Sequence, residues 1–373
     1  MRGFALVALA CYLAMPAWPS DKGKKQEKEE KEEQTQTRQL PQELPTSVVG
    51  NTHRLVFHVT PLSAKGLLSQ QSRDALKALM RQTNQETVLK IRAFVAGTGD
   101  MRRVRDLVSE VFTQRRRPLP VITLVQAGGL PLTGAQVVLE TISEGKKETN
   151  PFGLAFFSAS TAVSNSPYDP VAPLTEKALA ALRQALKAAG AQPADVLRVT
   201  CFLSSLDNFA ASRKLVETEY PGAALNYVQT QREPGQAMAA CEAVARLRSA
   251  IGEPVRLLNQ EGSPGEPGES LAALVAAPHV LLTGAQISFG YQESDSRLAF
   301  ERLAKELDQQ KVSTRDVVFA HYYPLSTGLA NQVRKLRAGF FDSAHPPAGS
   351  MLIFEGLPSM DAGFAVDVIA VKE

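Results

Sequence analysis

The sequence predicts an α+β fold made of three copies of one unit, each a sheet covered by two helices. The first observation is a run of β-forming residues that recurs at 87–95, 195–203 and 316–324. The second is that one helix-like segment precedes each run and another follows it. The third is the spacing, since the first valines of the three runs lie about 110 to 120 residues apart. Self-similarity at a nearly fixed period indicates a repeat, so the three segments are predicted to fold alike.

The helices that precede the runs are amphipathic. They are predicted over 72–82, 175–190 and 294–310. In the second of them, Leu179, Leu182 and Leu186 keep one face of the helix apolar. Ser72 and Thr175 stand at predicted helix starts, where a hydroxyl accepts a hydrogen bond from a free backbone N–H. Both are therefore expected to be N-caps.

Further strands and one more helix complete each unit. The helices that follow the runs are predicted over 100–112, 208–220 and 329–341. N-terminal strands are expected at 54–59, 153–160 and 279–286, and last strands at 136–143, 238–246 and 364–372. Each unit thus reads strand, helix, strand, helix, strand, strand, which predicts one sheet with both helices on the same face. We place the first, second and third units at 49–149, 150–252 and 253–373, with linker-like composition at 145–150 and 259–270.

The N-terminal segments differ from the units. Residues 1–20 hold one Arg and then an apolar run too short to span a bilayer, which is typical of a secretory signal peptide. A secreted or periplasmic protein without a membrane span is therefore expected, and an uncleaved interfacial anchor is the competing interpretation. Lipidation at Cys11 stays open. Residues 21–48 are mostly charged and polar, so they are predicted to form a flexible linker.

Composition argues against several functions. The chain has 373 residues and a net charge of +3, which is too small to predict a nucleic-acid or membrane surface. Its three Cys form no C-x-x-C pair and its five His are scattered, so neither a metal site nor a cofactor is predicted. Cys201 and Cys241 could pair in an oxidising compartment, but two buried free thiols are favoured. His279 and His321 are predicted to be packing or edge residues of strands.

Several segments carry a resemblance to a known family. They are DMRRVRDLVSEVF followed by PVITLVQAGGLP, then AALRQALKAAGAQPADVLRVTCFLSSLDNF, NFAASRKLVETEY and AGFFDSAHPPAGSMLIFEGLP. From about residue 50 to 373 the chain resembles the RidA/YjgF (reactive intermediate deaminase, Rid) superfamily. The resemblance implies chorismate-mutase-like units; family members form homotrimers around a central barrel, with a small-molecule cleft at each subunit boundary. Three units in one chain are therefore expected to form a covalent pseudo-trimer around a central β-barrel, so that a monomer acts as an intramolecular trimer.

The resemblance also implies a chemistry, the hydrolysis of an enamine or imine to a 2-keto acid and ammonia. In active members a strand Arg binds the substrate carboxylate, since its fork of donors matches two oxygens, and a Glu on the last strand positions water. The Arg position falls on Ile122, Leu225 and Gly349. The Glu position falls on Val138, Ala240 and Ala365. Because no unit keeps either residue, the family's usual deaminase reaction is not expected.

Other positions remain candidates for ligand binding. The family's Ser-Gly position makes Ser158, Thr283 and Gly284 candidates. The helix after each run keeps one Arg, and these are Arg105, Arg213 and Arg334. Such guanidinium groups could replace the lost strand Arg and bind an anionic ligand. The competing interpretation is that they are solvated or lie in weak surface pairs.

Each last strand keeps one acid. These acids are Glu140, Glu242 and Asp367. Each lies two residues past the lost Glu and therefore points to the same face of its strand. They are weak catalytic candidates, and satisfying buried backbone donors is the competing role.

Three hypotheses of function follow. The first is an exported RidA-like protein that binds a small carbonyl or anionic metabolite at clefts between units. The second is a divergent enamine or imine deaminase that uses one of the last-strand acids with Thr283 or Ser158. The third is a scaffold or interaction protein. A small molecule is the expected partner and nucleic acid is not, and the sequence identifies neither the ligand nor the pathway.

Overall fold

The computed structural model describes residues 42–233, 235–259 and 268–373. The predicted signal peptide lies outside the described residues, as do most of the predicted linker 21–48 and most of the segment 259–270. No helix in the described part of the chain is long and apolar enough to cross a membrane.

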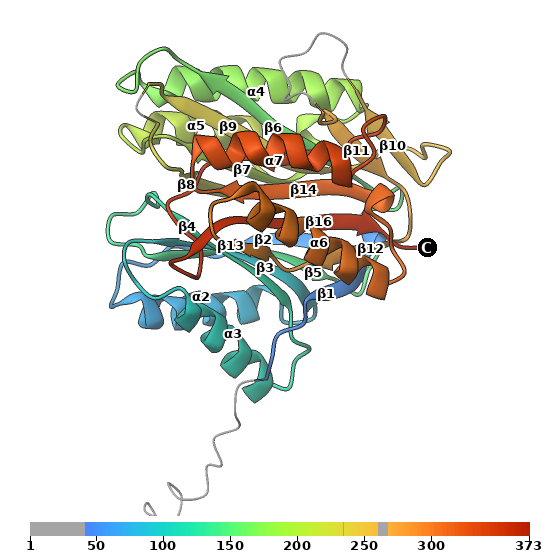
Figure 1. Cartoon of the computed structure of the whole chain (residues 1–373), viewed down its shortest axis with the longest axis horizontal. Helices are drawn as coiled ribbons and strands as arrows, with labels where there is room; N and C mark the ends of the chain where they lie inside the picture. Colours follow the sequence, from blue (N-terminus) through green and yellow to red (C-terminus); the bar gives the residue numbers. More distant parts are fainter. Residues whose placement is uncertain (1–41, 234, 260–267) are drawn as a thin grey trace, which may run out of the picture. The chain divides into compact units, whose positions relative to one another are not determined.

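The described strands form three sheets, shown in Figure 1. The first sheet has the order β2 (Leu55–Val59), β5 (Val137–Glu144), β3 (Thr87–Ala96), β4 (Val121–Ala127). The second has the order β10 (Val255–Leu258), β11 (Ala272–Val275), β6 (Leu154–Val163), β9 (Met238–Arg246), β7 (Val196–Leu203), β8 (Ala224–Gln229). The third has the order β1 (Ser47–Asn51), β12 (His279–Thr283), β16 (Ala362–Val371), β14 (Val317–Pro324), β15 (Ala348–Met351), and β13 (Gln286–Phe289) also pairs with β16. The α+β class is confirmed, but the described strands do not close into the single barrel that the resemblance implies.

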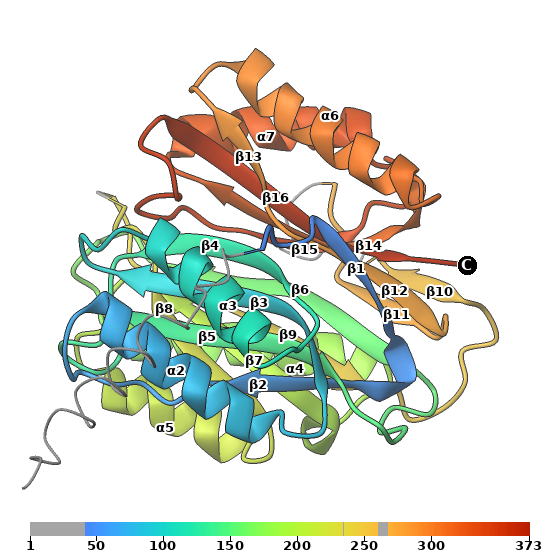
Figure 2. The same ribbon diagram turned by 90° about the horizontal axis from the view of Figure 1, so that it is seen from below.

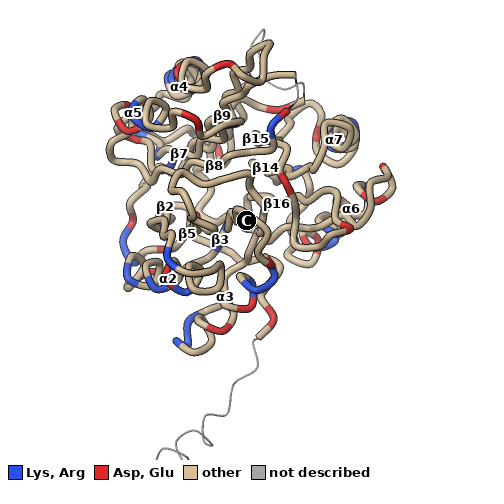
Figure 3. The backbone as a smooth tube through the Cα atoms, turned by 90° about the vertical axis from the view of Figure 1, so that its left-hand side faces the viewer, with Lys and Arg blue, Asp and Glu red and all other residues tan. Residues whose placement is uncertain are grey.

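One pair of helices covers each sheet. The pairs are α2 (Leu68–Gln82) with α3 (Arg102–Gln114), α4 (Val171–Ala188) with α5 (Phe209–Glu219), and α6 (Glu293–Gln309) with α7 (Thr327–Phe340). Short 3-10 helices also occur, η1 (Thr52–Arg54), η2 (Pro193–Asp195) and η3 (Thr314–Asp316). Figures 2 and 3 show each pair on the outer face of its own sheet, with most charged residues on helices and loops. The described part of the chain thus buries one face of every sheet under helices and turns the other face toward the neighbouring sheets.

Two predicted N-caps are wrong. Ser72 and Thr175 lie inside α2 and α4, which begin four residues earlier than the sequence predicts. The hydroxyl of Ser72 donates to Leu68 O at 2.7 Å, and that of Thr175 to Val171 O at 3.0 Å. Serine and threonine hydroxyls can make such bonds one turn back within a helix, so they do not always mark its start.

Short strands connect segments that are distant in sequence. The strand β1 begins within the predicted linker, and it pairs with β12 of the third unit. The strands β10 and β11 belong to the third unit by sequence, yet they extend the sheet of the second unit through β6. The third sheet therefore includes a strand that precedes the first unit's core, and the second sheet includes two strands of the third unit.

Five hydrophobic clusters make up the core. In three of these clusters, the residues lie between one sheet and the helices that cover it. The other two combine residues of all three units. In one shared cluster, Phe94, Phe202 and Phe354 lie with ring centroids 5.9 to 6.1 Å apart, one ring from each unit. The units therefore share a core and are not separate domains joined by linkers.

Backbone hydrogen bonds join three segments, one from each unit, which consist of the edge strands β4, β8 and β15 and the residues that follow them. Each of these segments contacts the other two, so the bonds form a closed cycle. They run from Gln126 N to Gly356 O at 2.8 Å, from Gly128 N to Gln229 O at 2.8 Å, and from Gln231 N to Ile353 O at 3.1 Å. Backbone pairing of this kind fixes the register between units independently of side-chain identity.

Cys201 and Cys241 form a disulfide, which corrects the expectation of free thiols. They lie directly opposite each other on the antiparallel strands β7 and β9, with Cα atoms 4.2 Å apart. Strand register could not be read from the sequence, so this proximity was not foreseen. Both residues are buried in the core of the second unit.

Removing this disulfide is expected to destabilise the protein. The bond joins residues 40 apart in sequence, and closing a loop of that length stabilises by about 2–4 kcal/mol through the unfolded state. The variant Cys201→Ala/Cys241→Ala should therefore unfold at a lower urea concentration than the oxidised wild type. Wild type treated with reductant under denaturing conditions and refolded with the reductant present is the control, and it should resemble the variant. Equal urea midpoints for oxidised wild type and variant would contradict the prediction.

Candidate functional site

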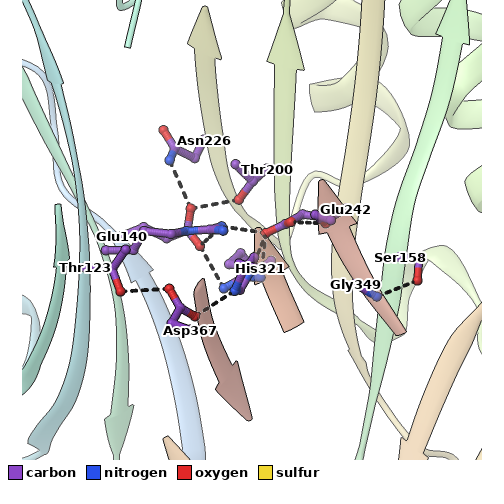
Figure 4. Close-up of polar contacts among 12 residues, drawn as sticks. Thr123, Glu140, Ser158, Thr200, Asn226, Glu242, His321, Gly349 and Asp367 are labelled. Carbon is purple, nitrogen blue, oxygen red and sulfur yellow. Dashed lines mark hydrogen bonds and ion pairs between the residues drawn. The ribbon is translucent and has the colours of Figure 1, made fainter. Parts of the chain in front are cut away.

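Seven ionisable side chains are buried where strands of the three sheets face one another, and Figure 4 shows part of this network. We call them the central charge cluster: Lys90 and Arg92 on β3, Glu140 on β5, Arg198 on β7, Glu242 on β9, His321 on β14 and Asp367 on β16. None is more than 4% exposed. Buried charges are costly unless paired, so the contacts of each carboxylate decide whether this arrangement is stable.

Glu140 is satisfied largely from the second unit. Its Oε1 lies 2.7 Å from Arg92 Nη2 and 2.7 Å from Arg198 Nη1. Its Oε2 accepts hydrogen bonds from Thr200 Oγ1 at 2.8 Å and from Asn226 Nδ2 at 3.0 Å. Both oxygens are therefore occupied by protein donors.

Glu242 is satisfied from the first and third units as well as its own. Its Oε1 pairs with Arg92, lies 3.1 Å from Arg198 Nη2, and lies 3.3 Å from His321 Nε2. Its Oε2 accepts a hydrogen bond from Ser350 Oγ at 2.6 Å. This carboxylate therefore connects residues of all three units.

Asp367 is satisfied from the first and third units. Its Oδ1 pairs with Lys90 and lies 3.0 Å from His321 Nδ1. Its Oδ2 accepts hydrogen bonds from Thr123 Oγ1 at 2.7 Å and Tyr323 OH at 3.0 Å. His321 is buried and packs against Phe319 as predicted, with ring centroids 4.9 Å apart, but its ring also bridges two buried carboxylates, which the sequence did not predict.

The three acids share one cyclic pattern of donors. Each accepts a hydrogen bond from the edge strand of another unit, at the residue directly after the lost-Arg position. These donors are Thr123 for Asp367, Asn226 for Glu140 and Ser350 for Glu242. The last-strand acids therefore hold the units together, and none of them lines the cavity described below.

The surrounding charges set the ionisation of the cluster. Burial raises the pKa of the Asp367 carboxyl, but Lys90 and His321 outweigh it and hold that pKa below its usual range. The same competition, with Arg92 as the main opposing charge, keeps the pKa of Glu242 well below normal. Arg198 and Arg92 likewise outweigh burial and lower the pKa of Glu140. Burial lowers the pKa of Lys90, and Asp367 offsets this only in part.

A cavity of about 160 Å³ lies between the second and third units. Its walls come from β6, from the segments after β7 and β8, from α7 and from β15. The lining includes Thr161, Thr230, Glu269, Arg334 and Gly349. A cavity of about 150 Å³ holds a molecule of benzene size, so this one suits a ligand of about six heavy atoms.

The predicted helix arginines do not come together. Arg105 is exposed on α3, and Arg213 is exposed on α5 with its Nε 2.6 Å from Glu217. Arg334 is half-buried on α7 and lines the cavity. The structure therefore places one of the three next to a space that a ligand could fill.

The Ser-Gly candidates hold strands together. Ser158 Oγ accepts from Gly349 N at 2.8 Å and donates to Ser270 O at 2.6 Å, so it lies beside the cavity with both bonds made. Thr283 Oγ1 accepts from Val368 N at 2.9 Å within the third sheet. Gly284 N donates to Thr46 O at 2.8 Å.

The three lost-Arg positions have different surroundings. Ile122 packs against an apolar core that includes Leu44, and Leu225 packs against the core of the second unit. Gly349 instead lines the cavity. A Cβ at Gly349 would lie 2.5 Å from both Ala320 O and Glu269 Oε1, so this position has no room for a side chain.

Sequence reasoning missed a buried ion pair between Arg337 and Glu269, of which Glu269 lies beside Gly349. Arg337 on α7 is 3% exposed, and its Nη1 lies 3.5 Å from Glu269 Oε1. Its guanidinium also lies 5.5 Å from the centroid of the Tyr322 ring. The repeat held a signal for Arg337, because the equivalent positions in the other units are the fully buried Val108 and Val216.

Among the described residues, no group of three His, Cys, Asp or Glu could hold a metal ion.

Fold and site together define a class: an α+β protein of tandem units with a small polar cavity between two of them. Neither the family models nor the curated proteins give a match to this chain. Solved structures do match, and they include members of the YjgF/Rid family that the sequence resembles. Each covers about a third of this chain.

Three of these structures illustrate the degree of similarity. Rv2704 of Mycobacterium tuberculosis, a YjgF/YER057c/UK114 family member, is 20% identical and covers 32% of this chain and 99% of its own, with a TM-score of 0.24. The Rid family protein YyfB of Yersinia pestis is 17% identical, covering 32% and 100%, with a TM-score of 0.29. The YjgF family protein NMB1025 of Neisseria meningitidis is 14% identical, covering 32% and 95%, with a TM-score of 0.23. Similarity of this degree carries no conclusion about activity.

The central charge cluster predicts strong acid sensitivity. The three carboxyls have lowered pKa values when folded, so they stay ionised there while the unfolded chain takes up protons near pH 4. Their stabilisation is complete above about pH 5 and is lost as the pH falls. Uptake of up to three protons on unfolding corresponds to a slope of up to about 4 kcal/mol per pH unit. Urea unfolding between pH 7 and pH 3 measures this slope.

Two variants test whether the pH dependence of the free energy of unfolding comes from the central charge cluster or from other acids. Asp367→Asn should reduce the slope by about a third, because one of the three low-pKa carboxyls is gone. Asp74→Asn, on α2, should leave the slope unchanged. If both variants keep the wild-type slope, the slope does not come from the carboxyls of the central charge cluster.

Gly349 is expected to tolerate no side chain. Gly349→Ala places a Cβ against Ala320 O and the Glu269 carboxylate, so the free energy of unfolding should fall by about 1–3 kcal/mol. Gly222→Ala is the matched control, because a Cβ there meets nothing within 4 Å. Thermal unfolding of both variants measures the difference. Equal melting temperatures for the two variants would show that a side chain fits at Gly349.

Proposed function

We propose that this chain is a small-molecule binding protein with a Rid-like fold, whose ligand site is the cavity between the second and third units. The ligand is a small carbonyl or anionic metabolite, and the family's usual deaminase chemistry is lost. The observation that carries the proposal is the cavity itself, about 160 Å³ in volume and bordered by Arg334. Small pockets with a few convergent polar groups are the usual sites of such ligands.

We further propose that the three units form a cyclic pseudo-trimer within one chain. Three observations support this arrangement: the closed cycle of backbone hydrogen bonds, the contact of one phenylalanine from each unit, and the cyclic donors of the central charge cluster. A ring that closes with three covalently joined copies needs no further subunits.

Only the boundary between the second and third units is proposed to bind a ligand. At the boundary between the third and first units, the described segment before β1 buries Leu44 against the core next to Ile122. The segment is held there, since Ser109 Oγ on α3 donates to Gln42 O at 2.6 Å. Apolar side chains therefore pack around Ile122 at this boundary, whereas Gly349 at the other boundary lines the cavity.

We also propose that the protein is exported. Disulfides persist in oxidising compartments and are rare in the reducing cytosol, so the Cys201–Cys241 bond supports the signal peptide predicted at residues 1–20.

The proposed site can be tested by blocking its rim. Thr327 is exposed, lines the cavity and begins α7, so Thr327→Trp should close the entrance without disturbing the core. Pyruvate and 2-oxobutyrate serve as probes, and isothermal titration calorimetry with the full chain should show at least tenfold weaker binding to this variant. Thr98→Trp is the matched control, since Thr98 is the exposed equivalent of Thr327 in the first unit. If Thr327→Trp binds both probes like wild type, the proposed site is wrong. If wild type binds neither probe, the ligand is not a small carbonyl compound or simple anion.

A further inference from the structure

Two residues unique to the third unit lie next to Glu269, which lines the cavity. Gly349 stands where the other units have Ile122 and Leu225, and Arg337 stands where they have Val108 and Val216. Both replacements are next to Glu269, whose Oε1 is 3.5 Å from Arg337 and occupies the space over Gly349. At this boundary the third unit thus has a charged Arg and a Gly where the other units have apolar side chains, and the Arg forms an ion pair with Glu269.

This ion pair is fixed in place. Arg337 and Glu269 have side chains only 3% and 8% exposed. A buried guanidinium is tolerated only with a partner, and here the carboxylate and the face of the Tyr322 ring both supply one. Because Gly349 has no side chain, nothing separates the Glu269 carboxylate from the strand β15 at the cavity wall.

The cavity therefore presents charges of both signs to a ligand. Glu269 and Arg334 both line it, together with Thr161 and Thr230. A ligand with only a negative group would bring like charge near Glu269, which is unfavourable in a buried setting. A ligand that also carries an ammonium group converts this repulsion into attraction.

We infer that Glu269 is the specificity-determining residue of the cavity and that the ligand class is small zwitterions, which combine an ammonium group with a carboxylate. This inference rests on the proposed binding function and narrows its ligand class. A zwitterion of about six heavy atoms, the size of alanine, matches the cavity volume. The ammonium faces Glu269, and the carboxylate faces Arg334.

Three probes of nearly equal size test the inference. L-Alanine carries both charges, propionate lacks the ammonium group, and ethylamine lacks the carboxylate. With the full wild-type chain, calorimetric titration should show L-alanine binding at least tenfold more tightly than either of the others. In Glu269→Gln, which keeps the shape of the side chain, the difference between L-alanine and propionate should fall below threefold. Glu217→Gln, an exposed change on α5, is the matched control and should keep the wild-type ratio.

The outcomes separate this inference from the proposed function. Propionate or pyruvate binding as tightly as L-alanine to wild type would overturn the zwitterion inference, while the proposed anion site would stand. An unchanged ratio in Glu269→Gln would overturn the role of Glu269. If neither the zwitterion nor any carboxylate binds to wild type, both proposals fail. The comparison of probes on wild type does not depend on whether any variant folds.

Discussion

The structure depends on pairing the buried ionisable groups of the central charge cluster. A carboxylate removed from water is stable only when cations and hydrogen-bond donors replace its hydration. Glu140, Glu242 and Asp367 each obtain these partners from strands of other units. Removing one partner of such a buried pair typically costs about 3–5 kcal/mol, so the cluster penalises any arrangement that separates the units. The apolar layers on either side of it could tolerate small shifts, but the hydrogen bonds could not.

The repeat made much of the fold predictable. Helices were found from apolar periodicity, as with Leu179, Leu182 and Leu186, which are all buried in α4. The strands β1, β10 and β11 were not predicted, because they are only four or five residues long and pair with segments distant in sequence. The N-caps were misplaced because a serine or threonine hydroxyl can bond within a helix as well as at its start.

The candidate site was less predictable than the fold, for a physical reason. Sequence reasoning assigned Glu140, Glu242 and Asp367 to one strand face, and that face is the one turned toward the other units. It could not show which charges meet there, since Lys90 and Arg92 lie on β3 and Arg198 lies on β7, away from the last strands. Arg337 is different, because alignment with Val108 and Val216 shows a charge at a core position. Such a charge predicts a buried partner, and the structure identifies that partner as Glu269.

Covalent linkage explains why the units could diverge in this way. In a symmetric homotrimer, three copies of the first unit would place three Lys90 and three Arg92 side chains against three Glu140 carboxylates. That arrangement would bury three uncompensated positive charges, which is prohibitively costly. In the cyclic arrangement proposed here, those cations are shared with Glu242 and Asp367, which belong to the other units. One chain can therefore hold three different units whose charges balance only together, and the same freedom allows one boundary to keep a polar cavity while another is filled.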